Sequence, residues 1–103
     1  MANATSNKVA IITGGSRGVG AATAKLLASK GWNVTITCTS SIQDANDIVQ
    51  ECERLGVEAL AITADVSEND DCVETVHQTI EKWGRIDALV NNCLLYTSDA
   101  ADE

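Results

Sequence analysis

The feature that most constrains the fold of this chain is a glycine-rich segment placed between an apolar run and a helix-like stretch. The segment reads TGGSRGVG over residues 13–20; VAII precedes it at 9–12 and AATAKLLA follows it at 21–28. A turn that leads from a strand into a helix offers unpaired backbone N–H groups and the partial positive charge of the helix N-terminus to an anion. Glycines remove the Cβ atoms that would keep a phosphate away from that backbone. The sequence therefore predicts a strand, a phosphate-binding turn and a helix in succession.

Apolar, β-branched runs alternate with segments of helical periodicity along the rest of the chain. Strands are predicted at 8–13, 33–38, 58–63 and 86–91, and helices at 18–30, 42–55 and 68–83. This alternation is typical of βαβ units and a parallel sheet. Right-handed crossovers and a strand order of 3-2-1-4 place the first two helices on one face of the sheet and the third on the other. We therefore expect a doubly wound α/β fold over residues 1–92.

Local signals support these boundaries. Three glycines fall just after the predicted helices, where a left-handed residue is wanted: Gly31, Gly56 and Gly84. Ser41 and Ser67 have the spacing of N-caps, with Asp44 and Asp70 at the third helical position.

Two of the predicted helices are amphipathic, which indicates the faces that they bury. The apolar face of the second helix consists of Ala45, Ile48, Val49, Cys52 and Leu55. The apolar face of the third helix consists of Val73, Val76, Ile80 and Trp83. We expect both faces to pack against the sheet.

The motifs of this chain resemble those of the short-chain dehydrogenase/reductase family. The spacing Gly-x-x-x-Gly-x-Gly is similar to the glycine motif of that family, and the match continues with Asp65-Val66 after the third strand and Asn91-Asn92 after the fourth. The resemblance covers residues 8–92. It implies a Rossmann-like sheet, cut here after its fourth strand, and an oxidoreductase that moves hydride between a nicotinamide cofactor and a carbonyl or alcohol substrate.

The resemblance assigns the phosphate cradle to residues of the glycine-rich segment. They are Gly14, Ser16, Arg17, Gly18, Val19 and Gly20. Ser16 is either a turn serine or a ligand of the phosphate. Arg17 is either a solvated surface arginine or a guanidinium that binds the 2′-phosphate of the ribose, and its position in the family motif favours the second interpretation.

The end of the second predicted strand carries no acid. Enzymes that use NAD commonly place a carboxylate there, which accepts a hydrogen bond from the ribose 2′-OH. The matching position is Cys38, followed by Thr39 and Ser40, whose hydroxyls could donate to a 2′-phosphate. Together with Arg17, this predicts NADP as the cofactor and Thr39 as one of its contacts. The run 37–40 also resembles the strand end of some 3-oxoacyl-acyl-carrier-protein reductases.

The resemblance also assigns residues to the adenosine end of the cofactor. Asp65 would accept from the exocyclic amine of adenine, and Val66 would contact the ring through its backbone and side chain. The alternative for Asp65 is that it merely starts the next helix. Asn92 would lie near the adenine ribose, whereas Asn91 is expected to tie strands together.

The family's catalytic groups are a serine, a tyrosine and a lysine four residues after the tyrosine, and none is matched within residues 1–92. Tyr96 is followed four positions later by Ala100, so we assign it no catalytic role. We expect the chain to be the N-terminal half of a dinucleotide-binding domain, inactive by itself because it lacks the acid/base pair that protonates the carbonyl oxygen.

Residues 93–103 do not continue the family pattern. Where the family would read Asn-Asn-Ala-Gly, this chain reads Asn91-Asn92-Cys93-Leu94. The segment CLLYTSDAADE resembles the translation of a transposase-type sequencing adapter, so we interpret residues 93–103 as a non-native tail and leave them out of fold and site reasoning.

Composition excludes several classes of function. A net charge of -8 without any basic cluster argues against nucleic acid and anionic membranes as partners. No stretch has the length of a membrane span or the pattern of a signal peptide. The four cysteines form no Cys-x-x-Cys pair and have no histidine at ligand spacing, so we expect neither disulfides nor a metal. We expect a cytoplasmic protein that acts on a small carbonyl or alcohol and, when complete, forms homo-oligomers.

Two other functions remain open. The first is a dinucleotide-binding module without catalysis, which the absence of a downstream Tyr-x-x-x-Lys would indicate. The second is a methyltransferase-like fold that binds S-adenosylmethionine, which also has a glycine-rich first turn. That fold expects an acid at the end of the second strand, and Cys38-Thr39 argues against it.

Overall fold

A four-stranded parallel sheet forms the centre of the molecule, in the order β3-β2-β1-β4. The computed structural model describes residues 6–14, 18–39, 42–65 and 67–91. The strands are β1 (Val9–Thr13), β2 (Asn33–Cys38), β3 (Ala59–Thr63) and β4 (Ala88–Asn91). The helices are α1 (Gly18–Ser29), α2 (Ile42–Arg54) and α3 (Asn69–Trp83). The predicted doubly wound fold and its strand order are confirmed, and every element lies within two residues of its predicted boundaries.

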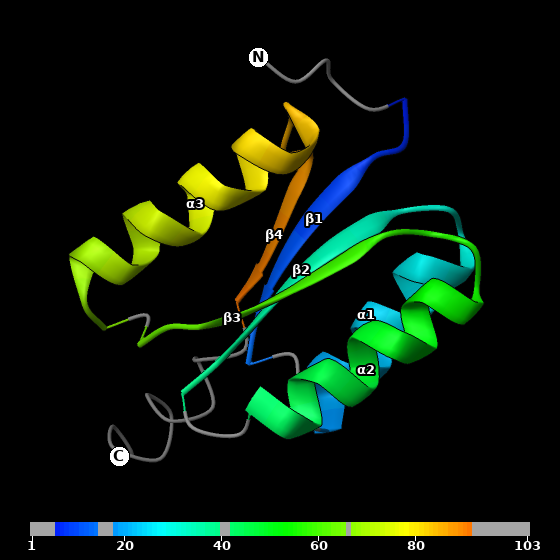
Figure 1. Ribbon diagram of the computed structural model, residues 1–103, viewed down its shortest axis with the longest axis horizontal. Helices are drawn as coiled ribbons and strands as arrows, with labels where there is room; N and C mark the ends of the chain where they lie inside the picture. Colours follow the sequence, from blue (N-terminus) through cyan, green and yellow to red (C-terminus); the bar gives the residue numbers. More distant parts are fainter. Residues whose placement is uncertain (1–5, 15–17, 40–41, 66, 92–103) are drawn as a thin grey trace.

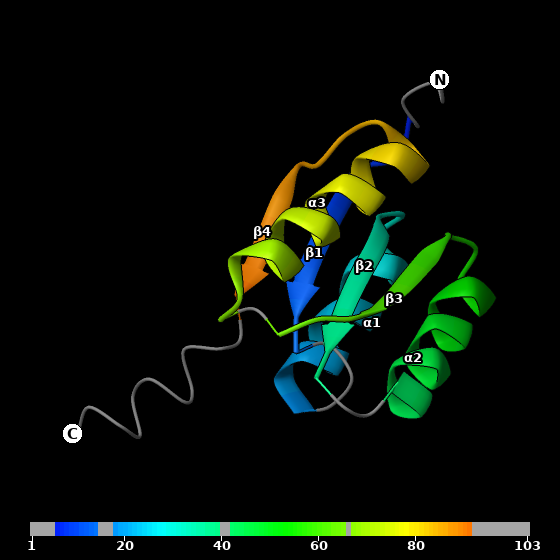
Figure 2. The same ribbon diagram turned by 60° about the vertical axis from the view of Figure 1, so that its left-hand side comes forward.

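The helices cover the two faces of the sheet unequally. Helices α1 and α2 lie together on one face and α3 lies alone on the other (Figure 1). The same division is visible in Figure 2, where β1 and β4 run side by side with their arrowheads toward one end of the sheet. This is the arrangement expected from right-handed crossovers.

The main apolar core lies between the sheet and the pair α1 and α2. The strands contribute Ile12, Val34 and Ile36, which alternate with residues of the opposite face and are fully buried. Ala24 and Ala28 of α1 are also buried, and their small side chains let the helix approach the sheet closely. The predicted apolar face of α2 is confirmed at Ala45, Ile48 and Cys52, with Val49 partly buried, whereas Leu55 lies beyond the helix and is half exposed.

The predicted buried face of α3 is wrong for three of its four residues. Trp83 is buried, but Val73, Val76 and Ile80 have exposed fractions of 59%, 47% and 43%. Thr75 and Thr79 face the sheet in their place. The reason is that β2 presents the buried Thr35 on this side, whose hydroxyl pairs with that of Thr79 at 2.9 Å.

The predicted cap of α3 is also wrong. Its N-cap is Glu68, which makes no side-chain capping bond, and the Ser67 hydroxyl instead donates to the Asp65 carboxylate. The other predicted cap, Ser41, lies outside the described residues. Gly31, Gly56 and Gly84 have the positive φ angles expected after helices.

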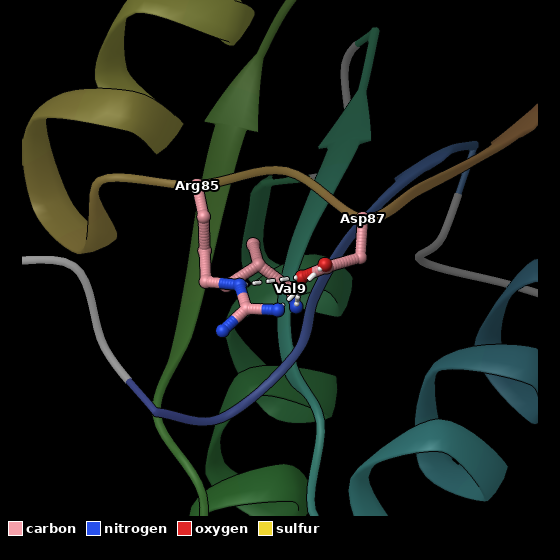
Figure 3. A network of polar contacts seen from close by, with 3 residues as sticks. All are labelled: Val9, Arg85 and Asp87. Carbon is pink, nitrogen blue, oxygen red and sulfur yellow. Dashed lines mark hydrogen bonds and ion pairs between the residues drawn. The ribbon is translucent and has the colours of Figure 1, made fainter.

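A polar network ties β4 to β1 at the amino end of the sheet (Figure 3). The Val9 N–H donates to Asp87 Oδ2 at 2.8 Å, and the Asp87 N–H donates back to the Val9 carbonyl at 2.7 Å. Arg85 donates to both oxygens of the same carboxylate, at 2.9 and 2.7 Å. The two bonds between Val9 and Asp87 come directly before the parallel pairing of β1 with β4. In that pairing Ala10 lies beside Ala88 and Thr13 beside Asn91.

Candidate functional site

The carboxyl ends of β1, β2 and β4 bring together polar side chains from distant parts of the sequence. Parallel strands all end at the same edge, which is where open α/β sheets bind ligands. Thr13 ends β1, and its hydroxyl donates to Asn91 Oδ1 at 3.1 Å and to the Val90 carbonyl at 3.4 Å. The expectation that Asn91 ties strands together is confirmed.

Two glycines of the predicted phosphate cradle have backbone conformations that side chains disfavour. Gly14 has a φ of 68° and Gly18 a φ of 55°, both in the left-handed region. A Cβ placed on Gly18 would meet no atom of the described chain within 4 Å. Gly18 is therefore required by its backbone conformation and not by crowding from the described residues.

The N-terminus of α1 follows this turn and gives the site a favourable electrostatic character for an anion. Its first turn contains Gly18, Val19 and Gly20 and no acidic residue. The unpaired N–H groups of the first turn and the helix dipole both attract negative charge. Val19 is 65% exposed, so its side chain is accessible to a bound molecule.

The end of β2 lies next to β1 in the sheet and carries no charge. Cys38 is buried, and its carbonyl accepts the Ala64 N–H at 2.8 Å, while Thr39 is exposed. Neither side chain is a carboxylate that would repel a phosphate. Ser40, the third member of this run, lies outside the described residues.

Asp65 follows β3 and is held in a defined position as a carboxylate. Its Oδ1 accepts the Ser67 hydroxyl at 2.6 Å and the Ser67 N–H at 3.0 Å, and its own N–H donates to Asp71 Oδ2 at 2.7 Å. These bonds from Ser67 lower the pKa of Asp65. An exposed carboxylate that stays ionised is a suitable acceptor for an amine such as that of adenine.

The predicted site is therefore described in part. Gly14, Gly18, Val19, Gly20, Thr39 and Asp65 lie at the carboxyl end of the sheet or just beyond it. Ser16, Arg17, Val66 and Asn92 lie outside the described residues. At this end the described residues offer hydroxyls, amides and the Asp65 carboxylate, which are groups that bind a ligand.

One residue of the site was not singled out from the sequence. The Thr37 hydroxyl, 1% exposed, accepts the Gly14 N–H at 3.2 Å. The sequence signal was weak, because Thr37 stands in a run of β-branched residues where threonine is an ordinary strand former.

Other polar candidates lie apart from this end. His77 is exposed and lies 3.7 Å from Glu81, four residues later on the same helix. Within residues 6–14, 18–39, 42–65 and 67–91, no group of three or more His, Cys, Asp or Glu side chains is arranged to hold a metal. The helices in those ranges are also too short or too polar to span a bilayer.

Comparisons with known proteins agree with this geometry. A family described as short chain dehydrogenase matches residues 8–102. The chain is 40% identical over 86 residues to the 3-oxoacyl-[acyl-carrier-protein] reductase FabG of Staphylococcus epidermidis, a match that covers 84% of this chain and 35% of that protein. It is 41% identical over 85 residues to the 3-oxoacyl-[acyl-carrier-protein] reductase of Synechocystis, covering 82% and 34%.

Solved structures give the same result. A dehydrogenase/reductase from Sinorhizobium meliloti superposes with a TM-score of 0.81 at 39% identity, over 86% of this chain and 35% of that one. The chain thus spans little more than a third of the relatives that it matches. The family match runs to residue 102, so it includes most of segment 93–103.

Proposed function

The chain belongs to the short-chain dehydrogenase/reductase family, and we propose that it forms the NADP-binding part of an oxidoreductase that reduces a carbonyl or oxidises the corresponding alcohol. The observation that carries this proposal is the turn between β1 and α1. Two left-handed glycines, Gly14 and Gly18, lead there into a helix whose first turn has no acid, and a Cβ on Gly18 would meet no described atom within 4 Å. Such a turn suits a pyrophosphate.

The preference for NADP over NAD rests on charge around the end of β2. Cys38 and Thr39 replace the carboxylate that would bind a ribose 2′-OH, and the Thr39 hydroxyl is exposed. Arg17 adds a positive charge in the glycine-rich segment. A 2′-phosphate would gain charge-assisted hydrogen bonds from such a guanidinium.

We assign the remaining contacts with the cofactor to Asp65 and to residues at the ends of the strands. Asp65 would accept a hydrogen bond from the adenine amine. Val66 would lie beside the adenine ring and Asn92 near the ribose. Thr13 and Asn91 hold the ends of β1 and β4 together beneath the cofactor. The bound cofactor would supply the hydride, and the acid/base tyrosine with its lysine would come from the part of the family fold that follows β4.

The substrate class that we propose is a 3-oxoacyl thioester. This rests on the names of the relatives from Staphylococcus epidermidis and Synechocystis. The alternative is a module that binds the dinucleotide without catalysis. The reading frame that continues from the Asn92 codon separates the two, since a downstream Tyr-x-x-x-Lys indicates an enzyme.

The cofactor proposal is tested in a chimera that joins residues 1–92 to the C-terminal part of a related reductase. We expect NADPH to bind more tightly than NADH. Arg17→Ala should remove a contact worth about 1.5–3 kcal/mol, or roughly 10- to 100-fold in NADPH affinity, while leaving NADH binding unchanged. Fluorescence titration of both cofactors measures this.

Lys25→Ala is the matched control for the chimera. It removes the same charge from α1, where Lys25 pairs with Glu51 at 3.6 Å. It should leave the preference intact. Equal affinities for NADPH and NADH in the unmutated chimera would refute the assignment of NADP.

The 103-residue chain by itself should show no hydride transfer, because it has no tyrosine and lysine four residues apart. Oxidation of NADPH is followed with ketones and 3-oxoacyl thioesters, and measurable turnover would contradict this. Deletion of residues 93–103 should leave dinucleotide binding unchanged if that segment is a non-native tail, as we propose.

A further inference from the structure

We propose that Thr37 is a positioning residue of the phosphate-binding turn, which it fixes by accepting the Gly14 N–H. The inference rests on the proposed function, because it assigns a role within the same dinucleotide site. The observation is the 3.2 Å bond from the Gly14 nitrogen to Thr37 Oγ1, across 23 residues of sequence.

The bond begins where the regular pairing of β1 with β2 stops. The register of these strands runs from Val9 beside Asn33 to Ile12 beside Ile36. Thr37 is the next residue of β2, and its hydroxyl accepts a hydrogen bond from the N–H of Gly14, the first residue of the turn. The first residue of the glycine turn is thus attached to β2 by a side chain at the point where the β1–β2 backbone ladder ends.

The bond also decides which amides a phosphate can use. The Gly14 N–H is already bonded, so the contribution of Gly14 to the cradle is its left-handed backbone, with a φ of 68°. Among the described residues, the amides left for a phosphate are those at the start of α1, at Gly18, Val19 and Gly20. Thr37 is buried and Gly14 is exposed, so removal of the hydroxyl leaves the Gly14 N–H without its acceptor on β2.

Thr35 provides a matched control on the same strand. It lies two residues before Thr37, so both side chains point to the same face of the sheet. It is equally buried, but its hydroxyl pairs with Thr79 of α3. Replacement of either threonine by valine removes one buried hydroxyl at nearly constant volume, and only one of the two touches the turn.

The test compares T37V, T37S and T35V in the 103-residue chain. Hydrogen exchange of the Gly14 amide, measured by NMR, reports the bond itself, and titration with NADPH and NADH reports its effect on binding. In T37V we expect faster exchange at Gly14 and about tenfold weaker binding of both dinucleotides, with their ratio unchanged. T37S, which keeps the hydroxyl, should restore both. T35V should lower thermal stability but leave both readouts as in the unmutated chain.

Two results would overturn the proposal: T37V with unchanged protection of Gly14, or T35V weakening dinucleotide binding as much as T37V does. A failure of the proposed function is distinguishable from either. If the unmutated chain binds neither dinucleotide, the proposed function is wrong, and the exchange rate of Gly14 still decides whether Thr37 holds the turn.

Discussion

The two ends of the parallel sheet are tied together by different chemistry. At the amino end, the Asp87 carboxylate binds Arg85 and the Val9 N–H, and Glu58 accepts the indole N–H of Trp83 at 2.7 Å. At the carboxyl end, the described ties between strands use the uncharged side chains of Thr13, Thr37 and Asn91. Two carboxylates therefore take part in the contacts at the amino end, whereas the described ties between strands at the carboxyl end are uncharged.

The difference shows how one sheet can be stabilised at both ends while only one end suits an anion. In a βαβ unit each helix begins near the carboxyl end of a strand, so the positive ends of the helix dipoles gather there. The hydrogen bonds of Thr13, Thr37 and Asn91 are uncharged, so they do not cancel the positive potential of the helix dipole at the start of α1. The Asp87 carboxylate would repel a phosphate, and it lies at the opposite end, where it accepts the Val9 N–H. The carboxylates of Asp65 and Asp71 at the carboxyl end follow β3 and do not stand in the first turn of α1.

The largest expected effect is at the amino end, at Trp83. The side chain is 2% exposed and anchors the C-terminal end of α3 beside Glu58. Trp83→Ala should lower the free energy of unfolding by about 3–5 kcal/mol, because it leaves a large cavity. Chemical denaturation measures the loss. A change below about 1 kcal/mol would contradict the view that this residue carries the packing of α3.

Asn33 should give the next largest effect. This buried amide begins β2, and its Oδ1 accepts the Glu58 N–H at 3.0 Å and the Asn7 side chain at 3.3 Å. Asn33→Ala should cost about 1–3 kcal/mol, because the Glu58 N–H loses its partner. Asn7→Ala is the control and should cost less, since the bond to Glu58 remains. Equal losses in the two variants would argue against this assignment.

A matched pair of glycines separates stability from binding. Gly18 and Gly31 both have positive φ, and an added Cβ meets nothing within 4 Å at either position. Alanine at each should therefore cost about 1–2 kcal/mol through backbone strain alone. Gly18→Ala should also weaken NADPH binding, whereas Gly31→Ala, beyond the far end of α1, should not. Loss of binding in both variants would mean that general destabilisation explains the effect.

The smallest expected effect is at Asp87, and it depends on pH. The Arg85 guanidinium, and after it the Val9 N–H, lower the pKa of Asp87. A carboxyl whose pKa is lower in the folded state stabilises the protein above its unfolded value of about 3.9, and this contribution is lost as the pH falls through the folded value. Asp87→Asn should therefore lower the melting temperature at pH 7 by a few degrees and reduce its decline below about pH 4.

Asp65 provides a comparison for Asp87 in the same series of melting temperatures measured against pH. Asp65 also has a lowered pKa, because Ser67 donates to it, so some acid sensitivity should persist in Asp87→Asn. Ser67→Ala should remove part of that remainder. If Asp87→Asn has the same melting temperature as the unmutated chain at both pH 7 and pH 3, the network in Figure 3 contributes nothing measurable.

Local patterns in the sequence predicted the strands, the helices and their order well. Apolar periodicity identified the face of α2 that is buried at Ala45 and Cys52, because that face packs on an apolar surface. The same reasoning was wrong for α3, where Thr79 faces the sheet because Thr35 lies opposite. Hydrophobicity gives no signal for a hydroxyl pair formed by residues 44 positions apart.

The candidate site was predictable to the extent that it depends on the backbone. The glycine-rich segment predicted the turn and the helix N-terminus that follows, but it did not indicate that Gly14 and Gly18 have left-handed backbone. Thr37 could not be found in this way, because its role depends on which residue the neighbouring strand places beside it. The cap at Ser67 was misassigned for a related reason: Asp65 competes for the same hydroxyl.

The most direct test of the contrast between the two ends is an NMR titration of the 103-residue chain with NADPH, following backbone amide shifts. If the carboxyl end binds the dinucleotide, the shifts should change at Gly14, Val19, Thr39 and Asp65 and stay constant at Asn33 and Asp87. Changes confined to the amino end, or no saturable change at millimolar NADPH, would contradict the assignment of the dinucleotide site to the carboxyl end of the sheet.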